Sequence, residues 1–467
     1  MPLPRPAYDP GFRPIISSWR EYLDRAKRAG AALLRVAVER EEGLVSVFVT
    51  RVPETDADPA ATYLIVERLV KFLLWSRGGW RVHFLGPAAI GKRLKADYSE
   101  KGARAFDVRT MSRIYQRPFE VVLDSPATFP EAREAVRFPG GHLDGCRIGF
   151  DLGASDYKIA AAIEGQAVYS QEIPWTPGAE ADPEYHFRHI RDGLKKAAAH
   201  LPRVDAIGGS SAGVIIRNQV RIASLFRSVP EDVFEKKVKD IFVRLGKEWG
   251  VPFEVLNDGE VTALAGMLSL GETGILGMAM GSSEAAGFLD IDGHIPGWLD
   301  ELAFVPVDLN PEAAVDEWSG DRGVGANCFS QQAVNKLART AGISFPDAMT
   351  LPERLEDIQS LMDRGDERAG AIFETIGVTL GFTIPWYEVF YRFSNLLVLG
   401  RVMSGPGGKI IVDKAAEVLK AEFPETAARV RLHLLDEKSR RVGQAVAAAS
   451  LPEIAGRESG AAPGGLS

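Results

Sequence analysis

Apolar and polar residues alternate along residues 1–144 with two different periods, which together predict an α+β unit. Leu33–Val38 and Val45–Val52 are short β-branched runs on either side of Glu41-Glu42-Gly43, a pattern typical of a β-hairpin. Tyr63–Trp75 carries its apolar residues at helical spacing. The same reasoning predicts a further helix and two further strands, at Ser17–Arg28, Arg81–Leu85 and Phe119–Leu123.

Beyond residue 144 the pattern alternates strands and helices in the order expected for two similar α/β lobes. We predict lobes at 145–270 and 271–455, a linker at Phe138-Pro139-Gly140-Gly141, and a disordered Gly-, Ala- and Ser-rich tail at 456–467. The helices predicted in the lobes are Pro183–His200, Pro230–Trp249, Glu260–Leu270, Asp366–Arg392, Asp413–Phe423 and Glu437–Ala449.

The segment Arg147–Ile163 combines an apolar strand with a short polar turn. Asp151 ends the strand, and Gly153 and Ser155 follow it directly. Glycine lets backbone N–H groups approach a phosphate without a Cβ in the way, and Mg²⁺ is usually held by one or two carboxylates. The segment therefore suits a Mg²⁺–phosphate loop, although taken alone it fits an ordinary hairpin turn better.

Four later strand-like segments also end in small or polar residues. The junctions are Ser210-Ser211-Ala212-Gly213, Asn257-Asp258-Gly259, Gly281-Ser282-Ser283, and Gly400 followed by Ser404-Gly405-Pro406-Gly407-Gly408. In this order and spacing, Gly145–Leu451 resembles the ROK family of sugar kinases, within the actin-like ATPase superfamily. The resemblance implies a two-lobed actin-like ATPase fold with ribonuclease H-like lobes, to which residues 1–144 add an N-terminal α+β domain.

The resemblance also implies ATP and Mg²⁺ as cofactors and assigns residues to them. Asp151 would hold Mg²⁺ through water. The first phosphate loop would be Gly153 and Ser155, the second would be Gly281, Ser282 and Ser283, and the adenosine pocket would be framed by Gly400 and Gly405.

Asp258 is the candidate catalytic base. In the resembling kinases an Asn-Asp pair lies at this strand-to-helix junction, where the Asp takes the proton of a sugar hydroxyl and the Asn binds a neighbouring hydroxyl. The alternative is that Asn-Asp-Gly is only turn and N-cap chemistry. The residues that the resemblance implies for substrate binding are Asn257, Glu301, Ser211 and Gly213.

Several residues depart from the family pattern. Glu284 follows the second phosphate loop, where it points away, binds a metal, or signals a weakened nucleotide site. Phe304 stands where the family has a zinc-binding His that also contacts the sugar, so we expect little use of glucose or mannose. Only Cys328 stands where the family has a cysteine cluster, so no structural zinc is expected. Asp321 and Arg322 lie in a glycine-rich loop, where they either contact an unusual substrate or, as we expect, form a salt bridge within the loop.

Composition limits the classes of protein that this chain can represent. Its 467 residues exceed what one core normally supports, and 46% hydrophobic with 25% charged residues is ordinary for a globular protein. A net charge of −8 argues against nucleic-acid binding. The two cysteines cannot form a disulfide framework, and neither a signal peptide nor a membrane span is visible. We therefore expect a cytoplasmic location.

Two functions from different classes remain open at this point. The first is ATP-dependent phosphorylation of a hydroxyl on a sugar or polyol-like small molecule, and Asp151, Asn257 and Asp258 favour it. The second is a nucleotide- or sugar-binding regulatory protein with little or no catalysis, which Glu284 and Phe304 favour. A homodimer is possible, since dimers are common in the resembling family.

Overall fold

A computed structural model describes residues 5–135, 137, 140–154, 156–434 and 437–454, of which 437–442 are described in their backbone only. The chain forms two compact units, each built from two separate stretches. Unit 1 contains residues 1–137 and 273–435, and unit 2 contains residues 138–272 and 436–467. Within the predicted linker, Phe138 and Pro139 lie outside the described residues, as does the predicted disordered tail at 456–467.

Unit 2 is built on a five-stranded sheet. Its elements are β5 (Cys146–Leu152), β6 (Asp156–Ile163), β7 (Gln166–Pro174), α5 (Pro183–Ala198), β8 (Ala206–Ser211), β9 (Val214–Ile216), β10 (Gln219–Ile222), α6 (Glu231–Val233), α7 (Ile241–Trp249), β11 (Phe253–Asn257), α8 (Asp258–Leu270) and α14 (Glu437–Ala449). The strand order is β11-β8-β5-β6-β7. Strands β5 to β7 form an antiparallel meander, to which β8 and β11 add in parallel. This is the predicted ribonuclease H-like arrangement.

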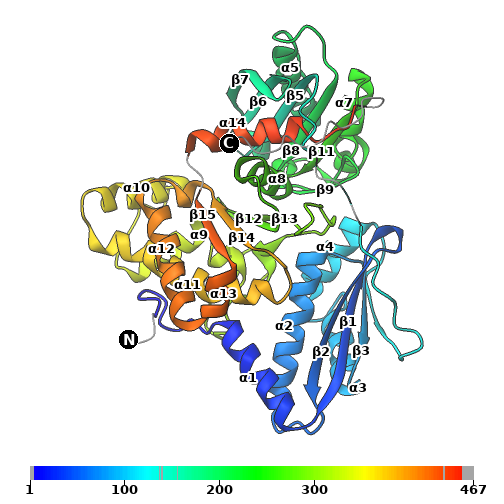
Figure 1. Ribbon diagram of the computed structural model, residues 1–467, viewed down its shortest axis with the longest axis vertical. Helices are drawn as coiled ribbons and strands as arrows, with labels where there is room; N and C mark the ends of the chain where they lie inside the picture. The colour runs from blue at the N-terminus through cyan, green and yellow to red at the C-terminus, as the bar shows by residue number, and fades with distance from the viewer. Residues whose placement is uncertain (1–4, 136, 138–139, 155, 435–436, 455–467) are drawn as a thin grey trace. The chain divides into compact units, whose positions relative to one another are not determined.

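The C-terminal helix α14 completes unit 2 by packing on the middle of its sheet (Figure 1). Two glycines of the sheet make this close approach possible. A Cβ at Gly149 on β5 would lie 1.7 Å from the carbonyl oxygen of Ala445, and one at Gly208 on β8 would lie 1.7 Å from that of Ala448. Any larger residue at these two positions would push the helix off the sheet.

The first 137 residues of unit 1 form an α+β layer. Its elements are α1 (Ile15–Arg28), β1 (Ala31–Glu39), β2 (Val45–Pro53), α2 (Pro59–Arg77), β3 (Arg81–Leu85), α3 (Ala88–Asp97), α4 (Ala105–Tyr115) and β4 (Glu120–Leu123). The sheet order is β2-β1-β3-β4, with the predicted antiparallel hairpin β1–β2 at one edge. Helix α2 begins after Asp58, whose side chain accepts the N–H of Ala61, and is buried along nearly its whole length.

Residues 273–435 of unit 1 form a second α/β layer. Its elements are β12 (Ile275–Met280), β13 (Glu284–Leu289), α9 (Gln331–Thr340), α10 (Leu351–Asp363), α11 (Glu367–Glu388), β14 (Asn395–Leu399), α12 (Pro406–Glu422), α13 (Pro424–Arg429) and β15 (Arg431–Leu434). The sheet order is β13-β12-β14-β15, in which β12 and β13 are antiparallel and the other two strands add in parallel. This sheet therefore repeats part of the unit 2 sheet, namely an antiparallel strand pair to which two further strands add in parallel.

Aromatic packing joins the two stretches of unit 1 into one core. Phe72 on α2 stacks on Phe390 with 3.8 Å between ring centres, and the edge of Trp386 on α11 meets Phe72 at 5.4 Å. Trp19 on α1 lies 5.9 Å from the same Trp386. The N-terminal α+β segment therefore shares a core with the predicted second lobe.

Within the described part of the chain, every helix is too short or too polar to cross a membrane.

Most predicted elements are found within a few residues of their expected bounds. One difference stands out. The predicted helix Pro230–Trp249 is divided into α6, a π-helical turn at Phe234–Val238, and α7.

Candidate functional site

The polar residues of unit 2 gather at one edge of its sheet. Strands β5, β8 and β11 run parallel, so their carboxyl ends meet at the same edge, where ligands of α/β sheets usually bind. Asp151 lies at the end of β5, Ser211 ends β8, and Asn257 ends β11. The topology of the sheet thus brings the predicted residues of this unit together.

Asp151 interacts with one residue on each of the two neighbouring strands. It is paired with Ser210 on β8 and with Lys158 on β6. The Ser210 hydroxyl donates to one Asp151 carboxylate oxygen at 2.7 Å, and the Lys158 ammonium lies 3.4 Å from the other. Asp151 is only 7% exposed, so Ser210 and Lys158 stabilise a carboxylate that has lost most of its water.

Asn257, rather than Asp258, caps helix α8. The side-chain oxygen Oδ1 of Asn257 accepts the N–H of Gly259 at 2.7 Å, and the Glu260 carboxylate accepts the backbone N–H of Asn257 at 3.3 Å, which completes a capping box. The Asn257 amide nitrogen also donates to the carbonyl of Gly213 at 2.7 Å. Asp258 is therefore the first residue of the helix, and its carboxylate is not needed as the cap.

The electrostatics of Asp258 suit a proton acceptor. Burial, and next the negative charge of Asp151, raise the pKa of Asp258 from 3.8 to about 6, against opposing backbone hydrogen bonds. A carboxylate with a pKa of about 6 is a stronger base than an ordinary aspartate and is still mostly ionised at neutral pH. Asp151 and Asp258 thus form a pair of carboxylates in which the charge of Asp151 raises the pKa of Asp258.

The remaining predicted residues of unit 2 have backbone or buried roles. Ser211 is fully buried and its hydroxyl donates to the carbonyl of Ala212 at 3.4 Å. Gly213 has a φ of 107°, and its carbonyl binds Asn257. Gly153 lies in the β5–β6 turn, where its carbonyl accepts the indole N–H of Trp175 at 2.8 Å. Ser155 lies outside the described residues.

The glycine loops of unit 1 meet at one edge of the second sheet. Gly281 follows β12 and Gly400 follows β14, and these two strands are parallel neighbours. The N–H of Gly281 donates to the carbonyl of Ser283 at 2.9 Å, and Ser282 and Ser283 are exposed. Gly405, with a φ of 66°, precedes α12. Two glycine-containing loops, each with exposed residues, therefore lie beside each other at the ends of these strands.

Glu284 turns into the interior and not toward the phosphate loop. It is 3% exposed, and the Tyr387 hydroxyl lies 3.4 Å from one of its carboxyl oxygens. Burial raises the pKa of Glu284 to about 8, a shift that Tyr387 opposes and Glu301 reinforces. The raised pKa favours the protonated form of Glu284 at neutral pH, and of the three alternatives left open by the sequence the structure has Glu284 pointing away from the loop.

Glu301 and Phe304 lie in a segment that contacts residues 1–137. Glu301 is partly buried, and its N–H donates to the carbonyl of Trp75 at 3.1 Å. The Phe304 ring lies 4.3 Å from the ring of Trp75 and 5.6 Å from that of Phe106, measured between ring centres. The N-terminal layer thus packs directly against the segment predicted to bind substrate.

Asp321 does not pair with Arg322 as predicted, because three cations of the N-terminal layer bind it instead. Its carboxylate lies 2.8 Å from Arg68, 3.1 Å from Lys71 and 2.9 Å from Arg104. Arg322 instead binds the carbonyl of Ala313. Burial alone would raise the pKa of Asp321, but Lys71 and Arg68 lower it below its ordinary value. We call Arg68, Lys71, Arg104 and Asp321 the ion cluster.

Cys328 lacks the surroundings of a zinc ligand. It is buried, and burial raises the pKa of its thiol to about 12, so it stays protonated. Cys146, the other cysteine, belongs to unit 2. Among the described residues, one group of three possible metal ligands lies within 4.8 Å, at the partly exposed turn Asp290, Asp292 and His294. That group contains no cysteine.

We therefore expect chelation to leave the fold unchanged. The ion pairs of Asp321 with Arg68, Lys71 and Arg104 attach the Ser319–Cys328 loop to residues 1–137 without a metal ligand. Treatment with EDTA should leave Tm unaltered, and metal analysis after dialysis should find no stoichiometric zinc. Stoichiometric zinc whose removal lowers Tm would contradict this prediction.

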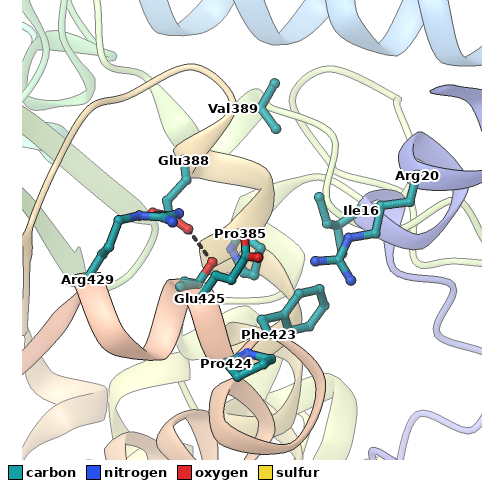
Figure 2. A pocket seen from close by; sticks show the side chains of 10 residues that line it. Ile16, Arg20, Pro385, Glu388, Val389, Phe423, Pro424, Glu425 and Arg429 are labelled. Atoms are coloured by element: carbon teal, nitrogen blue, oxygen red, sulfur yellow. Dashed lines mark hydrogen bonds and ion pairs between the residues drawn. The ribbon is translucent and has the colours of Figure 1, made fainter.

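A cavity of about 450 Å³ lies elsewhere in unit 1 (Figure 2). It is bounded by α1, the end of α11 and the α12–α13 junction. Its acidic residue Glu388 accepts hydrogen bonds from Thr426 and from Arg429, the latter at 2.9 Å, and Arg20 lies over the ring of Phe423 at 4.4 Å. None of the predicted site residues is among those that line it.

Comparison of the sequence with protein-family models and with curated proteins finds no match. Solved structures do resemble the chain. A ROK family glucokinase from Streptomyces griseus, in complex with glucose and AMPPNP, matches with a TM-score of 0.50 and 17% identity, over 66% of this chain and 99% of the glucokinase. A ROK hexokinase from Thermus thermophilus matches with a TM-score of 0.50 and 16% identity, over 65% and 97%.

A third solved structure is a regulator and not a kinase. This ROK family transcriptional regulator, a homologue of the E. coli MLC protein, matches with a TM-score of 0.51 and 17% identity, over 66% of this chain and 79% of the regulator. At such identities the likeness shows the fold and leaves the activity open. The chain therefore has the actin-like ATPase fold of the ROK-family structures.

Proposed function

We propose that this protein transfers the γ-phosphoryl group of ATP to a hydroxyl of a sugar or polyol-like small molecule. We also propose that it does so in the cytoplasm. The observation that carries the proposal is the carboxylate pair at the sheet edge of unit 2. Asp151 is held by Ser210 and Lys158, and Asp258 has a pKa raised to about 6. Phosphoryl transfer needs a metal site, a phosphate cradle and a positioned base, and these residues match that list.

The donors around Asp151 fit Mg²⁺. A carboxylate at a strand end, beside a serine hydroxyl and the Gly153 turn, offers the hard oxygen ligands that Mg²⁺ prefers. Asp151 would hold the ion through water. Bound Mg²⁺ neutralises part of the phosphate charge in phosphoryl transfer. The Lys158 ammonium lies 3.4 Å from Asp151 and would be a candidate to contact phosphate oxygens once nucleotide binds.

Asp258 would accept the hydroxyl proton as the acceptor oxygen attacks phosphorus. The negative charge of Asp151 increases the proton affinity of Asp258, because a second carboxylate nearby disfavours the ionised form. Asn257 caps α8 and so fixes the position from which the Asp258 side chain projects. Within unit 1, the loops at Gly281–Ser283 and Gly400–Gly405 are the segments proposed for phosphate and adenosine binding.

Calorimetric titration with Mg²⁺ and the ATP analogue AMPPNP tests this proposal. We expect Mg²⁺-dependent binding to the wild type and at least about tenfold weaker binding to Asp151→Ala, since the carboxylate is the ligand. Asp192→Ala is the matched control, because Asp192 is a 61% exposed aspartate of the same unit. Equal affinities of the wild type and Asp151→Ala would remove Asp151 from the site.

The regulatory alternative has one observation in its favour, namely that a ROK family transcriptional regulator shares the fold. ATP consumption in the presence of hexoses, amino sugars, polyols and nucleosides separates the two functions. Turnover with any acceptor supports the kinase. Nucleotide or sugar binding without turnover across the panel supports the regulator.

A further inference from the structure

The end of helix α2 holds the segment that carries Glu301. Three consecutive N–H groups, of Leu299–Glu301, donate to the carbonyl groups of Trp75–Arg77 at 3.0–3.3 Å. The last carbonyls of a helix have no partner within the helix. Here they are bound by the candidate substrate segment itself. Helix α2 belongs to the first 137 residues, which precede the part of the sequence that resembles ROK kinases.

Asp300 shows that this segment is held in an uncommon conformation. Its φ is 51°, in the left-handed region that residues with a Cβ rarely adopt. The Tyr391 hydroxyl donates to its carboxylate at 2.7 Å, and its N–H binds the carbonyl of Ser76. Such a conformation persists only when its surroundings determine it, and such residues gather at functional sites. Residues of α2 and α11–β14 therefore set where Glu301 lies.

Aromatic rings from both stretches of unit 1 gather beside Glu301. Trp75, Phe106 and Phe304 lie 4.3–5.9 Å apart between ring centres. Trp75 is 1% exposed and its indole N–H donates to Asp107 at 2.5 Å, so burial and this hydrogen bond fix the position of the ring. Phe106 and Phe304 are only partly buried. Phe106 and Phe304 form an apolar surface that packs against the buried ring of Trp75.

One turn of 3₁₀-helix separates Glu301 from Phe304. The N–H of Phe304 donates to the carbonyl of Glu301 at 3.2 Å, which closes the turn. The hydrogen bond keeps the backbones of Glu301 and Phe304 close together. Glu301 and the aromatic surface therefore belong to the same short segment, at which sugar binding is expected.

We propose that residues 1–137 supply one wall of the acceptor site, and that the acceptor carries a flat apolar group which packs on Phe106 and Phe304 while a hydroxyl binds Glu301. This inference rests on the proposed function and on the expectation, drawn from the family resemblance, that Glu301 binds substrate. An aromatic group offers the best match to such a wall, since rings pack edge-to-face or offset on one another. The substrate class is then an aryl glycoside or a similar aryl-substituted polyol.

Calorimetry with matched glycosides tests the inference without any need for turnover. The probes are the phenyl and methyl glycosides of glucose, mannose and N-acetylglucosamine. We expect the phenyl compound to bind about tenfold tighter than the methyl compound in at least one pair, from aromatic packing and burial of the ring. Equal affinities, or no binding, in all three pairs would overturn the inference.

Variants of Phe106 identify the wall. Phe106→Ala should abolish the phenyl preference, and Phe106→Leu, which keeps more apolar volume and protects the fold, should reduce it. Phe345→Ala is the control, because Phe345 is also a partly buried phenylalanine of unit 1 but packs against Arg354. A preference that survives in both Phe106 variants counts against this wall. If the wild type binds a phenyl glycoside but does not bind AMPPNP, the result counts against the proposed kinase activity and not against the aromatic wall.

Discussion

Replacing Asp258 by asparagine is expected to slow phosphoryl transfer by about 10²–10⁴-fold, the usual contribution of a general base. Asparagine keeps the size of the side chain and cannot accept the proton. The measurement is kcat with whichever acceptor of the panel the wild type uses. Asp192→Asn, at an exposed position of α5, should retain full turnover. Near-wild-type kcat in Asp258→Asn would show that Asp258 is not the base.

The pH dependence provides a second test of the same group. Because the base acts in its ionised form, kcat/KM of the wild type should fall as the pH drops through about 6, the raised pKa of Asp258. The folded protein disfavours ionised Asp258 relative to the unfolded chain, so Asp258→Asn should be as stable as the wild type or more stable above that pH. Lower stability of this variant at pH 7.5 would indicate a structural role instead.

Replacing Asp321 by alanine is expected to cause the largest loss of stability. The substitution leaves the buried Lys71, and with it Arg68, without one of its carboxylate partners, and removing one member of a buried ion pair typically costs about 3–5 kcal/mol. The expected decrease of Tm is roughly 6–10 °C for a unit of this size. Since the folded-state pKa of Asp321 is lowered, its contribution is present at neutral pH and is lost only in acid.

An exposed ion pair provides the control for that measurement. Asp413→Ala removes a pair with Lys409, whose side chains are 55% and 74% exposed, and should change Tm little because solvent screens such pairs. If Asp321→Ala shifts Tm no more than Asp413→Ala does, the ion cluster does not stabilise unit 1.

Local chemistry is what the sequence predicts well here. The hairpin β1–β2, the strand β3 and the helix α8 follow from alternation, turn residues and the turn and N-cap residues at Asn257-Asp258-Gly259. Helix α2 is recognisable from Tyr63–Trp75 but extends further at both ends, because a helix buried on most sides has no polar stripe to mark its limits. The fold class was predictable because strand-end polar residues recur in a fixed order.

Contacts between distant parts of the chain could not be predicted in the same way. Arg68 and Asp321 are separated by 253 residues, and nothing local distinguishes Asp321 from a residue paired within its loop. Ser210 and Lys158 were missed as partners of Asp151, because register decides which of two successive side chains faces a neighbouring strand. The protonation of Glu284 depends on burial that only the tertiary structure supplies.

The two interleaved units also constrain how the chain is synthesised and folded. The sheet of unit 2 is covered by α14, the last helix of the described chain, and its glycines at 149 and 208 face that helix directly. A nascent chain released up to residue 435 would therefore expose these strands, with nothing to cover them until α14 leaves the ribosome. Folding of unit 2 is completed only after α14 has been synthesised, and unit 1 must close around an insertion of 135 residues, from 138 to 272. C-terminal truncation before α14 should thus damage the unit that carries Asp151 and Asp258, although both lie far upstream.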